Sequence, residues 1–224
     1  MELKGAVAVV TGANRGLGRH LADQLVQRGA KVYAAARRPE TVDLAGVTPL
    51  RLDVTDEESV RAAARVASDA TLLVNNAGIS TGTTLVTGEL DAVRHELETN
   101  FFGPLALTRA FAPVIEGNGG GAVLNVLSAL SWLHPAGLGS YAATKAATWA
   151  QTNAVREELS PRGITVTALH VAYMDTDMAA GVPADQKVDP ADVAAQALDA
   201  VADGLPEVLA DDVTRQVKRG LANA

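Results

Sequence analysis

Short runs of apolar and β-branched residues alternate with longer stretches of helical periodicity along the whole chain. The short runs are continuously hydrophobic rather than alternating, which is typical of parallel strands buried on both faces. Repeated strand–helix units of this kind predict a doubly wound parallel sheet with right-handed crossovers. The predicted strands are 6–10, 31–35, 49–52, 72–74, 122–127, 165–170 and 207–210. The predicted helices are 17–28, 57–67, 89–115 with a break near Asn100, 141–159 and 191–202.

The same pattern predicts the domain organisation and the place of the chemistry. No repeat, linker or low-complexity tract interrupts it, so we expect residues 1–224 to form a single α/β domain. Its fold would be a Rossmann fold, with a parallel sheet of about seven strands and helices on both faces. Ligands of such open sheets bind beyond the carboxyl ends of the strands. Residues that carry chemistry are therefore expected in 11–18, 36–38, 53–54, 75–80, 128–134 and 171–178.

Composition narrows the classes of function. The formal net charge is −7, and no run of Lys or Arg occurs. Such a balance argues against binding to nucleic acid or to an anionic membrane. The chain has no cysteine for disulfides or thiolate chemistry, and the dispersed His20, His95 and His170 predict no metal site. The start of the chain does not resemble a signal peptide and no apolar run reaches membrane-spanning length, so a cytoplasmic location is expected.

A glycine-rich turn follows the first predicted strand and opens the first helix, from Thr11 to Gly18. Glycines let the backbone turn tightly and approach a bulky anion closely. The helix N-terminus then offers free N–H groups and the positive end of its dipole to a diphosphate. This spacing after a strand predicts a dinucleotide site. The residues expected to contact the cofactor here are Gly12, Asn14, Arg15, Gly16, Leu17 and Gly18.

The end of the second strand predicts which dinucleotide binds. Sites for NAD usually carry an acidic residue there, which holds the ribose hydroxyls. In this chain the position reads Ala36-Arg37-Arg38, with no acid. Arg37 or Arg38, together with Arg15 in the glycine-rich turn, would supply cations for a 2′-phosphate. NADP(H) is therefore favoured over NAD(H).

Tyr141 and Lys145 lie four residues apart at the start of a predicted helix, so they share one helical face. A free phenol has a pKa of about 10, too high for ready proton exchange at neutral pH. An ammonium one turn away favours the phenolate, which would make Tyr141 a usable general acid or base. Ser128, at the end of the fifth strand, could hold a substrate oxygen against Tyr141. Lys145 could also donate to the ribose of the nicotinamide.

Taken together, these motifs resemble the short-chain dehydrogenase/reductase family, and specifically an NADP(H)-preferring carbonyl reductase, over nearly the whole chain. The glycine-rich motif of the family matches Thr11 to Gly18, and its Asn-Asn-Ala-Gly run stands unaltered at 75–78. Its catalytic tetrad falls on Asn100, Ser128, Tyr141 and Lys145.

The resemblance also implies roles for single residues. Asn100 would be the helix-kinking Asn whose backbone carbonyl anchors a water that links Lys145 to solvent. Asp53 would accept a hydrogen bond from the adenine amino group, with Val54 offering its backbone. The turn that includes Asn75, Ala77 and Gly78 would line the adenosine ribose and the nicotinamide side of the cleft.

The chain departs from the family after the sixth strand. Members usually carry Pro-Gly there, followed a few residues later by Thr, whereas this chain has Val171-Ala172 and then Thr176. Thr176 remains placed to bond the nicotinamide carboxamide. The replacement alters the backbone freedom of the segment beside the nicotinamide and leaves the contacts of Val171 to Tyr173 open.

A mainly apolar pocket is expected over the reacting carbon, which favours an apolar ketone, aldehyde or alcohol as the small-molecule substrate. For Trp132 and His134, loop packing or a subunit contact is an equal alternative. The helix after Tyr141 is rich in alanine, and by resemblance to the family a homodimer or homotetramer is expected. The residues proposed to line the pocket are Ser80, Trp132, His134, Leu138, Tyr173 and Met178.

The sequence thus predicts an NADP(H)-dependent oxidoreductase that moves a hydride between the nicotinamide and a carbonyl or alcohol carbon, with Tyr141 as general acid or base. One alternative is a cofactor-sensing binding protein on the same fold, which would need neither Tyr141 nor Lys145. Others are an NAD(H)-dependent alcohol dehydrogenase and related chemistry such as dehydration or epimerisation. The natural substrate, its stereochemistry and the physiological direction are not determined by the residues.

Overall fold

All seven strands of the computed structural model, which describes residues 1–221, belong to one parallel sheet. The strand order is β3-β2-β1-β4-β5-β6-β7, so the direction of winding reverses between β1 and β4. Such a reversal places a ligand crevice at the carboxyl ends of the central strands. The strands are β1 (Val7–Thr11), β2 (Lys31–Ala36), β3 (Val47–Arg51), β4 (Leu72–Asn75), β5 (Gly121–Val126), β6 (Ile164–His170) and β7 (Glu207–Leu209).

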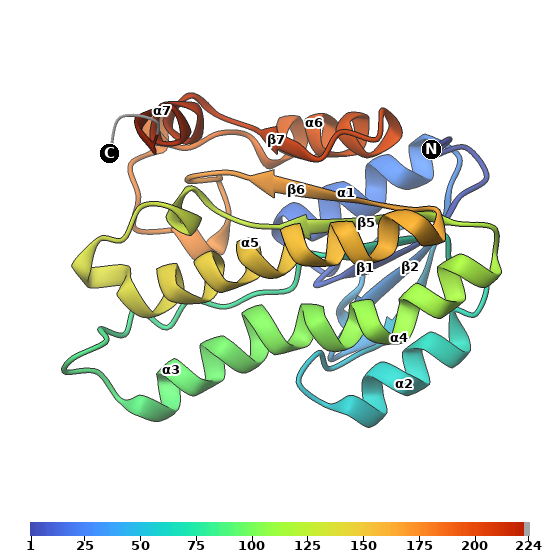
Figure 1. Cartoon of the computed structure of the whole chain (residues 1–224), viewed down its shortest axis with the longest axis horizontal. Helices are drawn as coiled ribbons and strands as arrows, with labels where there is room; N and C mark the ends of the chain where they lie inside the picture. The colour runs from blue at the N-terminus through green and yellow to red at the C-terminus, as the bar shows by residue number, and fades with distance from the viewer. Residues whose placement is uncertain (222–224) are drawn as a thin grey trace.

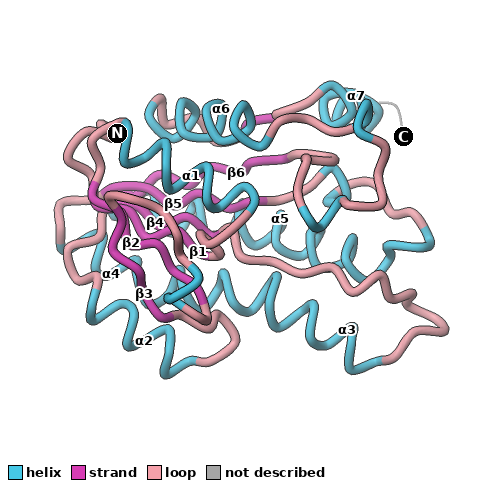
Figure 2. Tube along the Cα trace, turned by 180° about the vertical axis from the view of Figure 1, so that it is seen from behind, coloured by secondary structure: helices cyan, strands magenta, loops and turns pink. Residues whose placement is uncertain are grey.

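Helices cover both faces of the sheet (Figures 1 and 2). Consecutive strand residues point to opposite faces, so Ala8 and Val10 pack in the core on the side of α1 and α6, while Val9 packs on the other side. The helices α1 (Gly16–Gln27) and α6 (Pro190–Ala202) form the first layer. The opposite layer consists of α2 (Glu57–Val66), α4 (Gly103–Gly117) and α5 (Gly139–Leu159). This arrangement confirms the predicted doubly wound Rossmann fold.

The long helix predicted over 89–115 is broken close to Asn100. It consists of α3 (Leu90–Leu97), one π-helical turn (Glu98–Phe102) and α4. A π turn breaks the regular hydrogen-bond ladder, and such turns are frequent at functional sites. The α3 helix and the loop before it extend past the carboxyl edge of the sheet (Figure 1).

A helix that the pattern did not predict ends the described chain, α7 (Asp212–Gly220). Asp211 caps it by accepting a hydrogen bond from the Thr214 N–H at 2.8 Å. Asp211 is 5% exposed, so it is a buried cap and not a solvated helix end. The helix escaped prediction because it is short and polar, so its sequence lacks a wide apolar face.

The predicted strand limits differ from the observed limits by a residue or two. The largest difference is at β3, which begins at Val47, with Pro49 inside the strand and paired with Ala34. Proline lacks an N–H and is tolerated in an edge strand such as β3, because one side of that strand has no partner. Among residues 1–221, no helix is both long and apolar enough to cross a membrane.

Candidate active site

Thr11, at the end of β1, connects the glycine-rich turn to the run after β4. Its hydroxyl donates to the Val74 carbonyl at 3.1 Å and accepts from the backbone N–H groups of Asn76 and Ala77, each at 2.9 Å. The Asn76 amide also donates to the Thr11 carbonyl at 2.8 Å. Asn75 points into the sheet and donates to Asn125 at 2.8 Å. The run at 75–78 therefore braces the crevice between β1 and β4.

The glycine-rich turn has the geometry of an anion cradle. Gly12 and Gly16 have φ angles of +65° and +52°, a region that side chains disfavour. A Cβ added to Gly18 would lie 2.3 Å from the Gly12 carbonyl oxygen. Among residues 1–221, the N-cap residue Arg15 makes no side-chain capping bond to α1, which leaves the first N–H groups of the helix for a diphosphate. Leu17 is buried and packs in the core beneath the turn. A dinucleotide fits this cradle.

The end of β2 carries two exposed arginines and no acid. Ala36 is buried, while Arg37 and Arg38 are exposed. Asn14 donates from Nδ2 to the hydroxyl of Thr41 at 3.1 Å, which joins the glycine-rich turn to this segment. The turn and the two arginines are thus held on the same side of the crevice.

Arg15 has a different partner in this structure. Its Nη1 donates to Asp177 at 3.0 Å, and both side chains are largely exposed. Asp177 follows Thr176, whose methyl group would lie 3.4 Å from a Cβ on Gly16. The segment after β6 therefore lies directly against the glycine-rich turn.

Asp53 forms a tight turn at the end of β3. Its Oδ1 accepts from the backbone N–H and the hydroxyl of Thr55, at 3.0 and 2.7 Å. Partial burial raises the pKa of Asp53, but these bonds and the charge of Arg37 outweigh it, so the pKa lies below its ordinary value. Val54 packs against the start of α4, where a Cβ on Gly103 would lie 3.0 Å from it.

Ser128, Tyr141 and Lys145 meet at the carboxyl end of β5. The Ser128 hydroxyl is buried, lies close enough to Tyr141 to lower the pKa of its phenol, and accepts from the Leu130 N–H at 3.1 Å. Lys145 is buried and donates from Nζ to the Val126 carbonyl at 2.9 Å. The same Nζ lies 5.5 Å from the centre of the Tyr141 ring. The three predicted side chains are therefore assembled on β5 and α5.

Burial sets the protonation of these groups. It raises the pKa of Tyr141 well above its ordinary value, the charge of Glu96 raises it further, and the nearby Ser128 hydroxyl partly opposes both. Burial also lowers the pKa of Lys145 from 10.5 to about 8. The expectation that Lys145 lowers the pKa of Tyr141 is thus not met in this structure, because desolvation of the phenolate is the larger effect.

Asn100 lies in the π turn and connects three segments. Its side chain accepts from the Ile79 N–H and donates to the Ile79 carbonyl, both at 2.9 Å. It also donates to the Thr144 hydroxyl on α5 at 3.1 Å, and its backbone carbonyl accepts from Thr148 at 2.9 Å. A Cβ on Gly78 would lie 3.2 Å from the Asn100 side chain and 3.9 Å from Lys145 Nζ. Asn100 therefore fixes the loop after β4 against α5.

The segment that replaces Pro-Gly is tied to the C-terminal helix. The Val171 carbonyl accepts from the Ala129 N–H at 3.1 Å, and the Ala172 N–H donates to Asp211 at 2.8 Å. Asp211 is the capping residue of α7, so this helix holds the chain where it leaves β6. Of the contacts that the sequence left open, that of Ala172 is made with the cap of the helix that it did not predict, whereas Val171 is bonded by Ala129.

An apolar cavity of about 440 Å³ lies beside the first turn of α5. Gly139 and Ala143 line it, and these positions share a helical face on the side opposite Tyr141. The cavity is therefore distinct from the space over the Tyr141 hydroxyl. Of the predicted pocket residues only His134 lines it; Ser80, Tyr173 and Met178 are exposed and Leu138 is partly exposed. The other lining residues are Thr84, Leu85, Val86 and Ala136.

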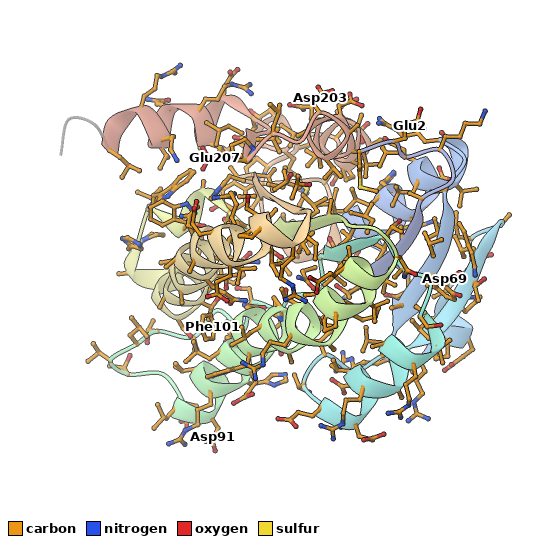
Figure 3. The ribbon with its side chains drawn as sticks, turned by 45° about the vertical axis from the view of Figure 1, so that its right-hand side comes forward. Glu2, Asp69, Asp91, Phe101, Asp203 and Glu207 are labelled. Atoms are coloured by element: carbon orange, nitrogen blue, oxygen red, sulfur yellow. The ribbon has the colours of Figure 1, made fainter. Side chains whose placement is uncertain are left out.

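Trp132 takes part in packing rather than standing open in a pocket. It is 8% exposed and stacks on His170, with ring centres 4.0 Å apart. Lys218 of α7 places its Nζ over the Trp132 ring, 4.4 Å from the ring centre. The same Nζ forms an ion pair with Glu207 at 2.9 Å. Glu207 lies beside the C-terminal helix (Figure 3).

His170 is fully buried and contacts the backbone of Ser128 directly. Its Nδ1 lies 3.1 Å from the Ser128 carbonyl, and its Nε2 lies 3.4 Å from Glu207. Burial lowers its pKa from 6.5 to about 4. His170 is therefore a packing residue behind Ser128. The one sequence signal for α7 was the spacing of Asp211 and Thr214, which is typical of a helix N-cap. That signal alone could have indicated the packing of Lys218, Trp132 and His170.

Known proteins resemble this chain throughout its length. The family model described as short chain dehydrogenase matches residues 6–187. A 3-oxoacyl-(acyl-carrier-protein) reductase FabG of Vibrio harveyi is 33% identical over 198 residues, covering 84% of this chain and 81% of the relative. An NADPH-dependent 1-acyldihydroxyacetone phosphate reductase of Schizosaccharomyces pombe is 33% identical over 184 residues, covering 79% of this chain and 62% of the relative.

A solved structure shows the same arrangement with a cofactor bound. It is a short chain dehydrogenase from Burkholderia cenocepacia in complex with NADP, 38% identical, with a TM-score of 0.95. The match covers 99% of this chain and 94% of that chain. With its fold, its glycine-rich turn and its Ser-Tyr-Lys constellation, this chain belongs to the short-chain dehydrogenase family of oxidoreductases.

Proposed function

We propose that this protein is an NADP(H)-dependent oxidoreductase that interconverts a ketone or aldehyde and an alcohol. The observation that carries the proposal is the convergence of Ser128 and Tyr141 at the end of β5, with Lys145 Nζ buried 5.5 Å from the phenol ring. Two hydroxyls that converge beside a dinucleotide cradle suit one substrate oxygen, which they would hold and protonate. A sensor protein would need no such pair.

The cradle would hold the cofactor across the carboxyl ends of the strands. The free N–H groups at the start of α1 would bind the diphosphate, and the run at 75–78 would line the ribose and the nicotinamide side. Asp53, whose second carboxylate oxygen is not used in the turn with Thr55, would accept from the adenine, with Val54 beside it. Thr176 would face the carboxamide. When bound, NADP(H) supplies or accepts the hydride.

The side chains of this chain would then handle the substrate oxygen and its proton. In reduction, Ser128 orients the carbonyl oxygen and Tyr141 gives it the phenolic proton as the hydride reaches the carbon. A raised pKa keeps Tyr141 in the phenol form that this step needs. Lys145 stabilises the phenolate left behind and holds the ribose. Alcohol oxidation uses the same groups in reverse.

Preference for NADP(H) is supported by charge at the end of β2. Arg37 and Arg38 are exposed, and the position that would bear an acid is Ala36. A guanidinium suits a phosphate, and the missing carboxylate removes repulsion toward it. The Burkholderia cenocepacia relative holds NADP. Arg15 is paired with Asp177 in this structure. When the cofactor binds, Arg15 would leave Asp177 and pair with the 2′-phosphate instead.

An apolar carbonyl compound is the proposed substrate class. Tyr173 and Met178, which follow β6 at the carboxyl edge, are 41% and 57% exposed. Exposed apolar side chains at the mouth of a site favour a substrate with an apolar body. We also propose a homodimer or homotetramer. Ala143 and Ala150 are small, exposed residues of α5, and Ala143 lines the apolar cavity, so a second copy could pack closely against this helix. Light scattering would give the mass in solution.

The first experiment is a fluorescence titration of the protein with NADPH and NADH, followed by a panel of aliphatic and aromatic aldehydes and ketones. The wild-type protein should bind NADPH more tightly and consume it with some of these carbonyls. Tyr141→Phe should bind NADPH nearly as well and lose turnover by about a hundredfold or more, because it lacks the acidic proton. Tight NADPH binding without turnover of any carbonyl or alcohol would instead indicate a cofactor sensor.

A further inference from the structure

A buried carboxylate lies outside the residues assigned to the reaction. Glu96, in the last turn of α3, is 0% exposed and forms no ion pair within residues 1–221. By contrast, Asp91 at the other end of α3 is in solvent (Figure 3). Burying an unpaired carboxylate is unfavourable unless hydrogen bonds compensate. The hydrogen bonds that Glu96 accepts must therefore account for its buried position.

Hydrogen bonds from two segments satisfy Glu96. Its Oε1 accepts from the backbone N–H of Thr81 and from the Thr81 hydroxyl at 2.9 Å. Its Oε2 accepts from the Ser140 hydroxyl, in the first turn of α5. A group that accepts three bonds and donates none has the pattern of an ionised carboxylate. Glu96 thus joins the loop after β4 to the residue that precedes Tyr141.

Glu96 and Asn100 act on the same two segments. They lie four residues apart, hence on one helical face. Asn100 binds Ile79 in the loop and Thr144 on α5, one turn beyond the Ser140 that Glu96 binds. The two side chains therefore clamp residues 79–81 at both ends of Ser80, and they clamp the first turn of α5 on both sides of Tyr141.

Glu96 also affects Tyr141 through its charge. Tyr141 is near Lys145 on its own helix, Glu96 on α3 and Ser128 after β5. His170 on β6 is neutral near pH 7, and the nearby loop carries the exposed His134. Of these groups, only Glu96 adds negative charge beside the phenol, and it raises the pKa of Tyr141.

We propose that Glu96 is a positioning residue for this reaction, which holds the Tyr141 hydroxyl and the loop at 79–81 as one unit around the reacting carbon. The proposal rests on the proposed function. The charge of Glu96 adds to the effect of burial in raising the pKa of Tyr141. Loss of the charge alone should therefore favour alcohol oxidation at lower pH.

Two variants separate geometry from charge. Glu96→Gln keeps the shape, and its new amide can donate to the Ser140 hydroxyl, so it removes the charge alone. Glu96→Ala removes the clamp as well. The matched controls are Glu98→Gln and Glu98→Ala, two residues away on the exposed side of the π turn. None of these side chains lies in the cofactor cradle, so the affinity for NADPH should stay within a few-fold of wild type.

The kinetic test is the pH profile of kcat/KM for oxidation of the alcohol made from the best carbonyl of the panel. This profile rises with the phenolate form of Tyr141. In Glu96→Gln the rising part of this profile should move to lower pH, since a like charge has been removed. Glu96→Ala should lower kcat at least about tenfold, because misplaced reacting groups lose rate steeply. Superimposed profiles for wild type, Glu96→Gln and Glu98→Gln would overturn the charge effect.

Hydrogen–deuterium exchange tests the clamp without requiring turnover. Glu96→Ala should exchange faster than wild type in the peptides that contain 79–81 and 140–144, while Glu98→Ala should not. Unchanged exchange in both peptides would overturn the positioning role, even in an active enzyme. If the wild-type protein reduces no carbonyl but the exchange result holds, the clamp stands and the proposed reaction fails.

Discussion

Tyr141 shows how far the surroundings of one residue change its chemistry. Its spacing from Lys145 predicted a phenol activated by an ammonium, yet burial and Glu96 hold its pKa above the ordinary value. Lys145 is itself buried, with a pKa lowered to about 8, so it carries its full charge only below that pH. The residue types were readable from the chain, but their protonation depends on desolvation, which only packing determines.

Arg37 offers a test of cofactor choice at a single residue. Arg37→Ala should weaken NADPH binding about tenfold or more and NADH binding little, because only NADPH has the phosphate that the guanidinium would pair. Fluorescence titration with both cofactors measures this. Arg65→Ala, on the exposed surface of α2, serves as control. Equal losses for both cofactors would show that Arg37 does not recognise the 2′-phosphate.

At the scale of elements, α7 is the part whose role the pattern of the chain least revealed. It is anchored by Asp211, which binds Thr214 in the helix and Ala172 beyond β6. Its Lys218 lies over Trp132, next to the loop after Ser128. A short polar helix thus supports two walls of the crevice from outside the sheet.

Removing the Asp211 cap should destabilise the fold. Asp211→Ala leaves the Ala172 N–H and the Thr214 groups without their partner, so we expect a loss of roughly 2–3 kcal/mol in the free energy of unfolding. Urea denaturation measures it. The neighbouring Asp212 is almost fully exposed, and Asp212→Ala should change stability by less than about 0.5 kcal/mol. Similar losses in both variants would contradict a specific capping role.

At the scale of the whole molecule, the sheet places a buried histidine behind the site. His170 has a pKa of about 4 in the fold, against an ordinary value of 6.5. Because the folded pKa is the lower one, the unfolded chain takes up the proton first as pH falls. The contribution of His170 to stability is therefore present above about pH 6.5 and is lost as pH falls toward 4.

This predicts a pH-dependent difference between wild type and His170→Asn. At pH 7 the variant should be the less stable, since it loses the stacking on Trp132. Between pH 6.5 and 4 that difference should shrink by up to about 3 kcal/mol. Chemical denaturation over this range measures it, with His95→Asn at an exposed site as control. A constant difference in the free energy of unfolding across this pH range would show that His170 is not a neutral buried histidine with a lowered pKa.

The amino-acid pattern alone was sufficient for most of the fold. Continuous apolar runs separated by amphipathic stretches indicated the order of strands and helices, because those periods reflect which faces are buried. The glycine-rich turn, the missing acid after β2 and the Tyr141–Lys145 spacing were also readable, since each depends on residues close in the chain. The helix break near Asn100 was likewise predicted from residues close to it in the chain.

Only the tertiary structure decided what depends on distant residues. It brought Glu96 to Ser140 and Asp211 to Ala172, contacts between segments 44 and 39 positions apart. It also turned Trp132 into packing beside His170 and put the apolar cavity on the far side of α5 from Tyr141. Local periodicity reports which face of an element is buried, whereas partners and pKa values follow from what the whole fold brings to that face.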